Sequence, residues 1–213
     1  MSVHVVDAML PKFPPDSYEL INCKHGTFFL NDFDKDVSEH MRFYGEWAEG
    51  ELQIFLSLVQ EGDIVLDIGA NIGAFTIPLA KKVGPNGRIH AFEPQSLINQ
   101  RLSANVVLNG LENVNIYHAA LGNHSGKIQV PYLNYKIESN FGGLSLASPM
   151  EGQTKEWSYD VALLTLDSIN FYNPYSGKDC PTFIKIDVEM MEKYVLQGGV
   201  NTINRCRPMI HAE

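Results

Sequence analysis

Residues 65–73 have the sequence Val-Leu-Asp-Ile-Gly-Ala-Asn-Ile-Gly, in which an apolar run with one acid ends in a glycine turn. Gly69 permits a sharp turn from a strand into a helix, and Gly73 lets that helix pack closely. Turns of this kind occur in open α/β sheets, where ligands bind outside the carboxyl ends of the strands. The stretch therefore predicts both the fold class and the place of the ligand site.

Strand-like and helix-like segments alternate on both sides of this turn. Strand, helix, strand, helix and strand within about 60 residues indicate right-handed βαβ units and a parallel sheet. Apolar runs and helical spacing predict strands at 63–68, 88–92, 114–119, 183–188 and 208–213, and helices at 47–60, 74–83, 94–108, 166–172 and from 191 onward.

The N-terminal part and one internal segment depart from this alternation. Residues 1–43 predict an arm followed by a β-hairpin, whose strands Tyr18–Cys23 and Thr27–Leu30 flank a glycine turn. Residues 44–213 form the expected α/β domain. Within it, residues 122–163 are polar and contain glycine, which predicts an inserted β-region that acts as a substrate lid.

The composition predicts an acidic globular protein. Of 213 residues, 45% are hydrophobic, and 16 basic against 25 acidic side chains leave a formal net charge of −9. That charge repels a phosphate backbone, so nucleic acid is not an expected partner. Cys23, Cys180 and Cys206 are widely spaced and predict neither a disulfide nor a metal site. With no secretory signal and no apolar run of membrane-spanning length, we expect a cytoplasmic protein.

Two acids follow the pattern of a nucleoside site. Asp67 lies two residues before Gly69, and Glu93 ends the second strand, 24 residues after Gly69. An acid at the end of the second strand can accept hydrogen bonds from both ribose hydroxyls. A dinucleotide site needs glycine at position 71 to admit a pyrophosphate, but this residue is Asn71. S-adenosylmethionine, a nucleoside with a sulfonium and an amino acid, matches this pattern. The alternative for Asp67 is a helix-capping acid in a structural glycine turn. The alternative for Glu93 is a solvated loop acid or a charge at a helix N-terminus.

Further stretches match one known pattern: Tyr44-Gly45-Glu46-Trp47 and residues 65–80, 91–95, 104–114, 140–146, 165–169, 183–199 and 207–213. With them the chain resembles the FkbM-like family of S-adenosylmethionine-dependent methyltransferases. The resemblance implies a Rossmann-like class I methyltransferase sheet, mostly parallel. It also implies a cofactor site with Asp67, Gly69, Ala70, Asn71 and Gly73 around the methionine part, Glu93 at the ribose and Ala120 near the adenine.

Lys185, Asp187 and Glu189 alternate along one side of the strand at 183–188. Burying these charged side chains without partners would cost free energy. We therefore expect them at the carboxyl end of the strand, in the ligand crevice. In a methyltransferase, Asp187 would take the proton of a substrate hydroxyl, Glu189 would position the reactants and Lys185 would contact substrate. The alternative is an ion network that orients the next helix. The family usually has glycine where this chain has Met190.

The resemblance also places Tyr44 and Glu46 at the site mouth beside Trp47, where we expect the first two to bind substrate. An ordinary surface aromatic with a helix-entry acid is the alternative for this pair.

These patterns predict an enzyme that methylates a hydroxyl on a sugar or glycosylated small molecule, as in polysaccharide modification. A non-catalytic module that binds S-adenosylmethionine or a partner protein is the alternative, because Met190 replaces the glycine. About five core strands are expected, so the last two strands of a seven-stranded class I sheet would be missing. A homodimer that covers the open edge is a candidate assembly. Asn71 disfavours a nicotinamide dehydrogenase.

Overall fold

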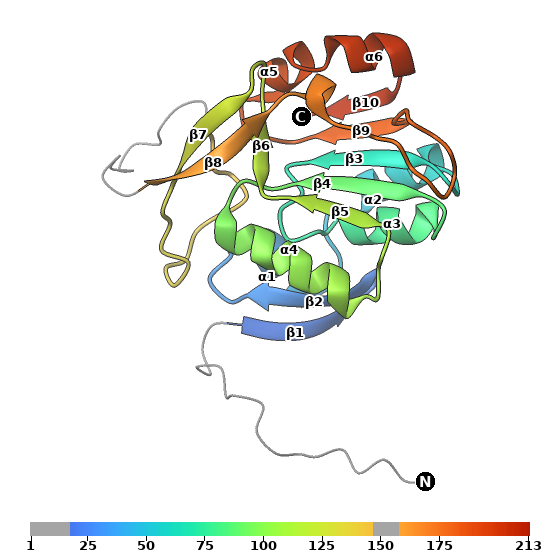
Figure 1. The fold of residues 1–213 in the computed structure, drawn as a ribbon. Coiled ribbons are helices and arrows are strands. Elements are labelled where there is room, and N and C mark those ends of the chain that lie inside the picture. The colour runs from blue at the N-terminus through green and yellow to red at the C-terminus, as the bar shows by residue number, and fades with distance from the viewer. Residues whose placement is uncertain (1–17, 147–157) are drawn as a thin grey trace, which may run out of the picture.

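A five-stranded parallel sheet forms the centre of the computed structural model, which describes residues 18–146 and 158–213 (Figure 1). Its strand order is β10-β9-β3-β4-β5, and every neighbouring pair is parallel. The bounds are β3 Ile64–Ile68, β4 Arg88–Phe92, β5 Val114–Tyr117, β9 Phe183–Ile186 and β10 Met209–Ala212. The predicted α/β class is confirmed, and no antiparallel edge pair occurs in this sheet among the described residues.

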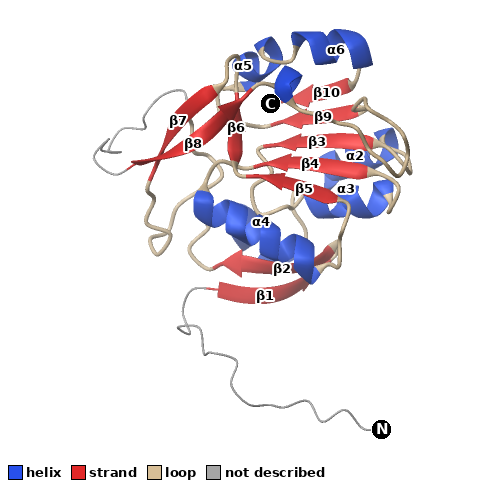
Figure 2. Cartoon of the chain, viewed as in Figure 1, coloured by secondary structure: helices blue, strands red, loops and turns tan. Residues whose placement is uncertain are grey.

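Alternating side chains bury both faces of the sheet. Val65 and Phe183 pack against helices on one face, whereas Leu66 and Ile184 pack against the segment after β8 and α5 on the other. Both faces of a parallel sheet are normally covered in this way. Figure 2 shows the helices on the two sides. They are α2 Glu49–Leu58, α3 Thr76–Val83, α4 Ser96–Leu108, the 3₁₀ turn η1 Leu166–Ser168, α5 Glu192–Gln197 and α6 Val200–Cys206.

The N-terminal hairpin, β1 Tyr18–Cys23 and β2 Gly26–Asn31, packs against α4. Two side-chain amides on this helix satisfy backbone groups of β2. The Phe29 amide donates to Asn105 Oδ1 at 2.6 Å, and the Thr27 amide donates to Asn109 Oδ1 at 3.1 Å. The hairpin is thereby attached to the sheet domain. The predicted arm at residues 1–17 lies outside the described residues.

A second sheet stands at the carboxyl ends of the parallel strands (Figure 1). It has the order β6-β8-β7, with β6 Ala119–Leu121, β7 Gly126–Pro131 and β8 Ser158–Leu164. The single strand expected at 114–119 is therefore two strands in different sheets, interrupted at His118. Apolar residues lie on both sides of His118, so hydrophobicity alone does not reveal the break.

Three local expectations differ from the structure. Helix α1, Val37–Tyr44, was not predicted, and only a 3₁₀ turn begins the helix expected at 166–172. Cys180 and Cys206 form a disulfide with a Cα–Cα distance of 5.2 Å. The prediction of no disulfide is therefore wrong, because the strand–helix–strand path brings together residues distant in sequence. The cysteines consequently carry no argument for a cytoplasmic location.

No helix within residues 18–146 and 158–213 is long and apolar enough to cross a bilayer. Strand β10 lies at one edge of the parallel sheet. A homodimer across this edge stays a prediction.

Candidate functional site

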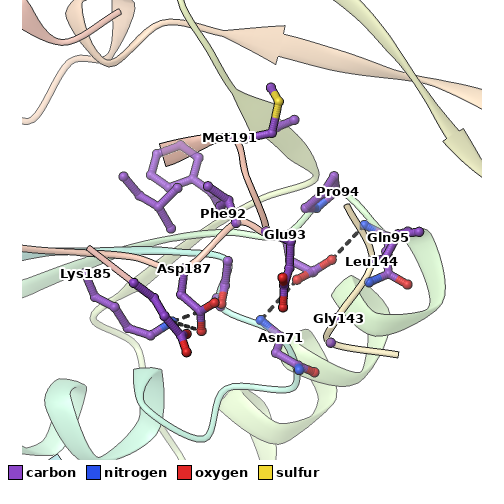
Figure 3. A pocket seen from close by; sticks show the side chains of 18 of the residues that line it. Asn71, Phe92, Glu93, Pro94, Gln95, Gly143, Leu144, Lys185, Asp187 and Met191 are labelled. Carbon is purple, nitrogen blue, oxygen red and sulfur yellow. Dashed lines mark hydrogen bonds and ion pairs between the residues drawn. The ribbon is translucent and has the colours of Figure 1, made fainter. Parts of the chain in front are cut away.

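A cavity of about 310 Å³ opens at the carboxyl ends of β3, β4 and β9. Figure 3 shows Asn71, Glu93 and Asp187 converging on it from successive strand ends. Its wall is formed by Asp36, Val37, Trp47, Ile68, Gly69, Ala70, Asn71, Ala74, Phe75, Phe92, Glu93, Pro94, Gln95, Ala119, Ala120, Leu121, Asn140, Gly142, Gly143, Leu144, Leu146, Lys185, Asp187, Val188, Glu189, Met191 and Glu213.

The glycine turn has a backbone that other residues would not easily adopt. Gly69 has φ +83°, and a Cβ there would lie 1.8 Å from the carbonyl oxygen of Asp187. Asn71 has φ +49°, and its Oδ1 accepts a hydrogen bond from the Ile72 amide at 2.8 Å. A Cβ on Gly73 would lie 2.9 Å from Leu102 Cδ1, so this glycine permits close packing of α4. The turn thus needs Gly69 for the cavity floor and Gly73 for packing.

Glu93 holds its carboxylate at the cavity wall with only 4% of the residue exposed. Its Oε2 accepts from the Asn71 amide at 3.1 Å, and its Oε1 accepts from the Gln95 amide at 2.8 Å (Figure 3). Burial raises the pKa of Glu93 to about 7, although both backbone bonds act in the opposite direction. The remaining lone pairs can accept from a vicinal diol.

Lys185 is buried beneath the cavity and contacts three oxygens. Its Nζ lies 3.3 Å from Asp67 Oδ1, 3.2 Å from the Gly69 carbonyl oxygen and 3.4 Å from Asp187 Oδ2. Burial alone would lower the pKa of Lys185, but the charges of Asp67 and Asp187 raise it above its ordinary value. An ammonium has three donors. These contacts occupy all three, so Lys185 orients Asp187 and has no donor left for a substrate.

Side-chain hydrogen bonds hold the 132–146 segment of the insertion over the cavity. Gln95 Nε2 donates to the Phe141 carbonyl at 2.8 Å, and the Tyr135 hydroxyl donates to Gln95 Oε1 at 2.9 Å. Asn140 Nδ2 donates to Asp36 Oδ2 at 3.0 Å. Gln95 also bonds Glu93, so these contacts connect the insertion to the Glu93 side of the cavity.

The structure brings most of the predicted site residues together. Those in the cavity wall are Gly69, Ala70, Asn71, Glu93, Ala120, Lys185, Asp187 and Glu189. Asp67 is fully buried behind the wall, where Thr76 Oγ1 donates to its Oδ2 at 2.6 Å, and Gly73 also lies outside the wall.

The predicted substrate residues Tyr44 and Glu46 are not in the wall. Tyr44 is 72% exposed at the end of α1, and Glu46 pairs with Lys24 at 3.4 Å. Their neighbour Trp47 does line the cavity.

Sequence reasoning missed Asp36, Gln95 and Glu213 as site residues. Gln95 follows the strand-end Glu93-Pro94, so its position was a usable signal. Glu213 directly follows β10, and the rule that ligands bind at carboxyl strand ends could have identified it. Asp36 directly precedes α1, and an acid before the helical spacing of Val37 and Met41 was a usable, if short, signal.

The charges of the wall select for a cationic ligand. Five carboxylates, those of Asp36, Glu93, Asp187, Glu189 and Glu213, face one ammonium, that of Lys185, among the described lining residues. Since Lys185 is already ion-paired, the described part of the wall offers no free cation for a pyrophosphate. An adenosine with a sulfonium and an amino group fits this set of carboxylate acceptors, and the cavity volume is typical of small-molecule sites.

The chain matches one family model and is similar to solved structures. The model of the methyltransferase FkbM domain matches residues 67–213. A crystal structure of methyltransferase FkbM from Methylobacillus flagellatus KT has a TM-score of 0.48 and 18% identity, covering 73% of this chain and 34% of that chain.

Two curated proteins match shorter parts of the chain. The 23S rRNA (uracil(1939)-C(5))-methyltransferase RlmD of Acinetobacter baylyi is 39% identical over 28% of this chain and 13% of its own length. The tRNA(Phe) (4-demethylwyosine(37)-C(7)) aminocarboxypropyltransferase of Methanocaldococcus jannaschii is 38% identical over 45% of this chain and 36% of its own. The chain thus spans little more than a third of these relatives at most. With the FkbM model matched over most of its length, the chain belongs to the FkbM family of S-adenosylmethionine-dependent methyltransferases.

Proposed function

We propose that this chain transfers the methyl group of S-adenosylmethionine to a hydroxyl of a neutral saccharide or glycosylated small molecule. The observation that carries the proposal is that Glu93 and Asp187 face the same cavity from β4 and β9, the strands on either side of β3. Glu93 would accept from the ribose hydroxyls, and the turn at Gly69 and Asn71 would hold the methionine part. When bound, the cofactor supplies an activated methyl group on a sulfonium.

Asp187 is the proposed proton acceptor for the substrate hydroxyl. Its carboxylate is partly exposed in the cavity and is held by Lys185 at 3.4 Å. Alignment of the hydroxyl oxygen with the methyl carbon would supply most of the rate enhancement. Proton removal by a positioned carboxylate would contribute about 10²–10⁴-fold.

The acidic wall supports a neutral acceptor. Carboxylates accept hydrogen bonds from sugar hydroxyls, whereas an acceptor bearing phosphates would meet repulsion. The net charge of −9 argues in the same way against an RNA substrate such as those named for the curated relatives.

Calorimetric titration of S-adenosylmethionine tests the cofactor assignment. We expect Glu93→Ala to weaken binding at least tenfold, while Glu112→Ala, which removes an exposed carboxylate outside the cavity, leaves binding unchanged. Equal binding by wild type and Glu93→Ala would overturn the assignment.

Mass spectrometry of cell-extract glycans incubated with labelled cofactor tests the transfer. A labelled methyl ether that is absent with Asp187→Asn supports the proposed enzyme. Cofactor binding with no labelled product would favour the alternative of a non-catalytic cofactor-binding module, which the replacement of glycine by Met190 motivates.

A further inference from the structure

Asp187 and Glu213 occupy equivalent places at the ends of neighbouring strands. In the parallel pair β9–β10, Ala212 is in register with Ile186, and the Glu213 amide donates to the Ile186 carbonyl at 3.2 Å. The next residues of the two strands are therefore Asp187 and Glu213. Both line the cavity. The fold thus places a second carboxyl group beside the proposed proton acceptor.

The surroundings of Glu213 disfavour its ionisation. The charge of Asp187 is the largest of the causes that raise the pKa of Glu213 above its ordinary value. Glu51 and Glu189 act in the same direction. His211, the other titratable residue of β10, lies 2.8 Å from Glu51 and is engaged there. On the opposite side, Lys185 contacts Asp187 at 3.4 Å.

We propose that Asp187 and Glu213 act as one proton-accepting pair, which makes Glu213 a second catalytic carboxylate. This inference rests on the proposed function. Two carboxylates at neighbouring strand ends repel one another when both are ionised, so the pair takes up one proton more strongly than an isolated carboxylate does. Lys185 limits the repulsion within the doubly ionised pair, so the pair can still form that state.

The proposed step balances in atoms and charge. The hydroxyl oxygen forms a bond to the methyl carbon, the bond from that carbon to sulfur breaks, and its electron pair stays on sulfur. The hydroxyl proton passes to the doubly ionised pair and is then held between Asp187 and Glu213. Two carboxylates, one sulfonium and one neutral hydroxyl become a singly protonated pair with one negative charge, a neutral thioether and a methyl ether.

A carboxyl ¹³C NMR titration of the folded chain tests the pair without substrate or cofactor. The Glu213 resonance is assigned by its loss in Glu213→Gln. We expect it to titrate above the ordinary glutamate value of about 4.3 and its midpoint to fall by more than half a pH unit in Asp187→Asn. Glu51→Gln is the matched control, because it removes a nearby charge outside the cavity wall and should shift the midpoint less. Equal midpoints in wild type and Asp187→Asn would overturn the inference.

Transfer rates test the catalytic role. Glu213→Gln should lower kcat at least tenfold and leave KM for S-adenosylmethionine within twofold. The double variant Asp187→Asn/Glu213→Gln should be no more than about threefold slower than the slower single variant, because residues that act as a unit are not additive. If the reductions in kcat of the two single variants multiplied fully in the double variant, the pair would be contradicted. A kcat of Glu213→Gln within threefold of wild type would contradict it as well. A wild type that binds no cofactor would defeat the proposed function alone, and the titration would still decide whether the carboxyl groups share a proton.

Discussion

Lys185 Nζ lies 3.3 Å from Asp67 Oδ1, and the two side chains are 3% and 0% exposed. This pair connects β9 to β3 directly beneath the glycine turn. Because the same ammonium contacts Gly69 and Asp187, one buried ion pair positions both the glycine turn and the proposed base.

Lys185→Met should destabilise the fold, because it leaves the buried Asp67 charge without its ion-pair partner. Removing one partner of a buried pair typically costs about 3–5 kcal/mol. Urea unfolding measures the loss. Lys127→Met, which breaks an exposed pair with Asp160, is the control and should cost less than about 1 kcal/mol. A similar cost for both variants would show that the buried pair is not structurally important.

Gly69→Ala should abolish cofactor binding and destabilise the chain. The added Cβ would meet the Asp187 carbonyl oxygen, so the backbone between β3 and β9 must shift. Gly45→Ala is the matched control, because Gly45 also has positive φ, at +71°, but no atom lies within 4 Å of the added Cβ. It should cost only about 1–2 kcal/mol for the backbone conformation. Comparable losses in calorimetry and unfolding for both variants would refute the close-approach argument.

Affinity for S-adenosylmethionine should rise with pH between 6 and 8. The pKa of Glu93 is raised to about 7, and only the ionised carboxylate accepts from both ribose hydroxyls. Protonation below pH 7 therefore competes with binding, and linkage predicts about tenfold weaker binding at pH 6 than at pH 8. Calorimetry at several pH values measures the slope. Glu93→Gln should bind S-adenosylmethionine weakly, and its affinity should not change with pH. If the affinity of this variant changed with pH as in wild type, another group would be responsible for the pH dependence.

Met190→Gly should leave cofactor binding unchanged and the free energy of unfolding equal or about 1 kcal/mol higher. Met190 has φ +73°, in the region that favours glycine, while its side chain is 67% exposed and lies outside the cavity wall. The control is Met191→Gly, because Met191 has φ −101° and lines the cavity. We expect this control to lose stability and affinity. Tighter cofactor binding by Met190→Gly would instead show that the methionine obstructs the site.

Cys206→Ser should lower the free energy of unfolding by about 2–4 kcal/mol, because the Cys180–Cys206 disulfide closes a loop with a sequence separation of 26. Cys180 precedes β9, so the disulfide lies at the end of the sheet away from the cavity, and cofactor binding should persist. Cys23→Ser, at the free cysteine, is the control. Alkylation of three thiols in unreduced wild type would contradict the disulfide.

The regular part of the fold was predictable because each element carries its own signal. The strand at 88–92 and the hairpin strand at 18–23 agree with β4 and β1, since apolar runs bounded by turn residues are local features. Helix α1 and the break at His118 were not identified in this way. In α1 the helical spacing is limited to Val37 and Met41 within eight residues, so its signal is short. The break at His118 depends on which strands pair with each side of it, because β5 and β6 belong to different sheets.

The residue order alone was enough to specify the parallel α/β sheet, the glycine turn and the acids at its strand ends, because strand polarity brings those ends to one edge. Tertiary packing decided which of them face the cavity. It buried Asp67 behind Lys185, left Tyr44 outside, brought the 132–146 segment over Gln95, and set Glu213 beside Asp187. These outcomes depend on strand order and on contacts between residues as much as 118 positions apart, which no local pattern records.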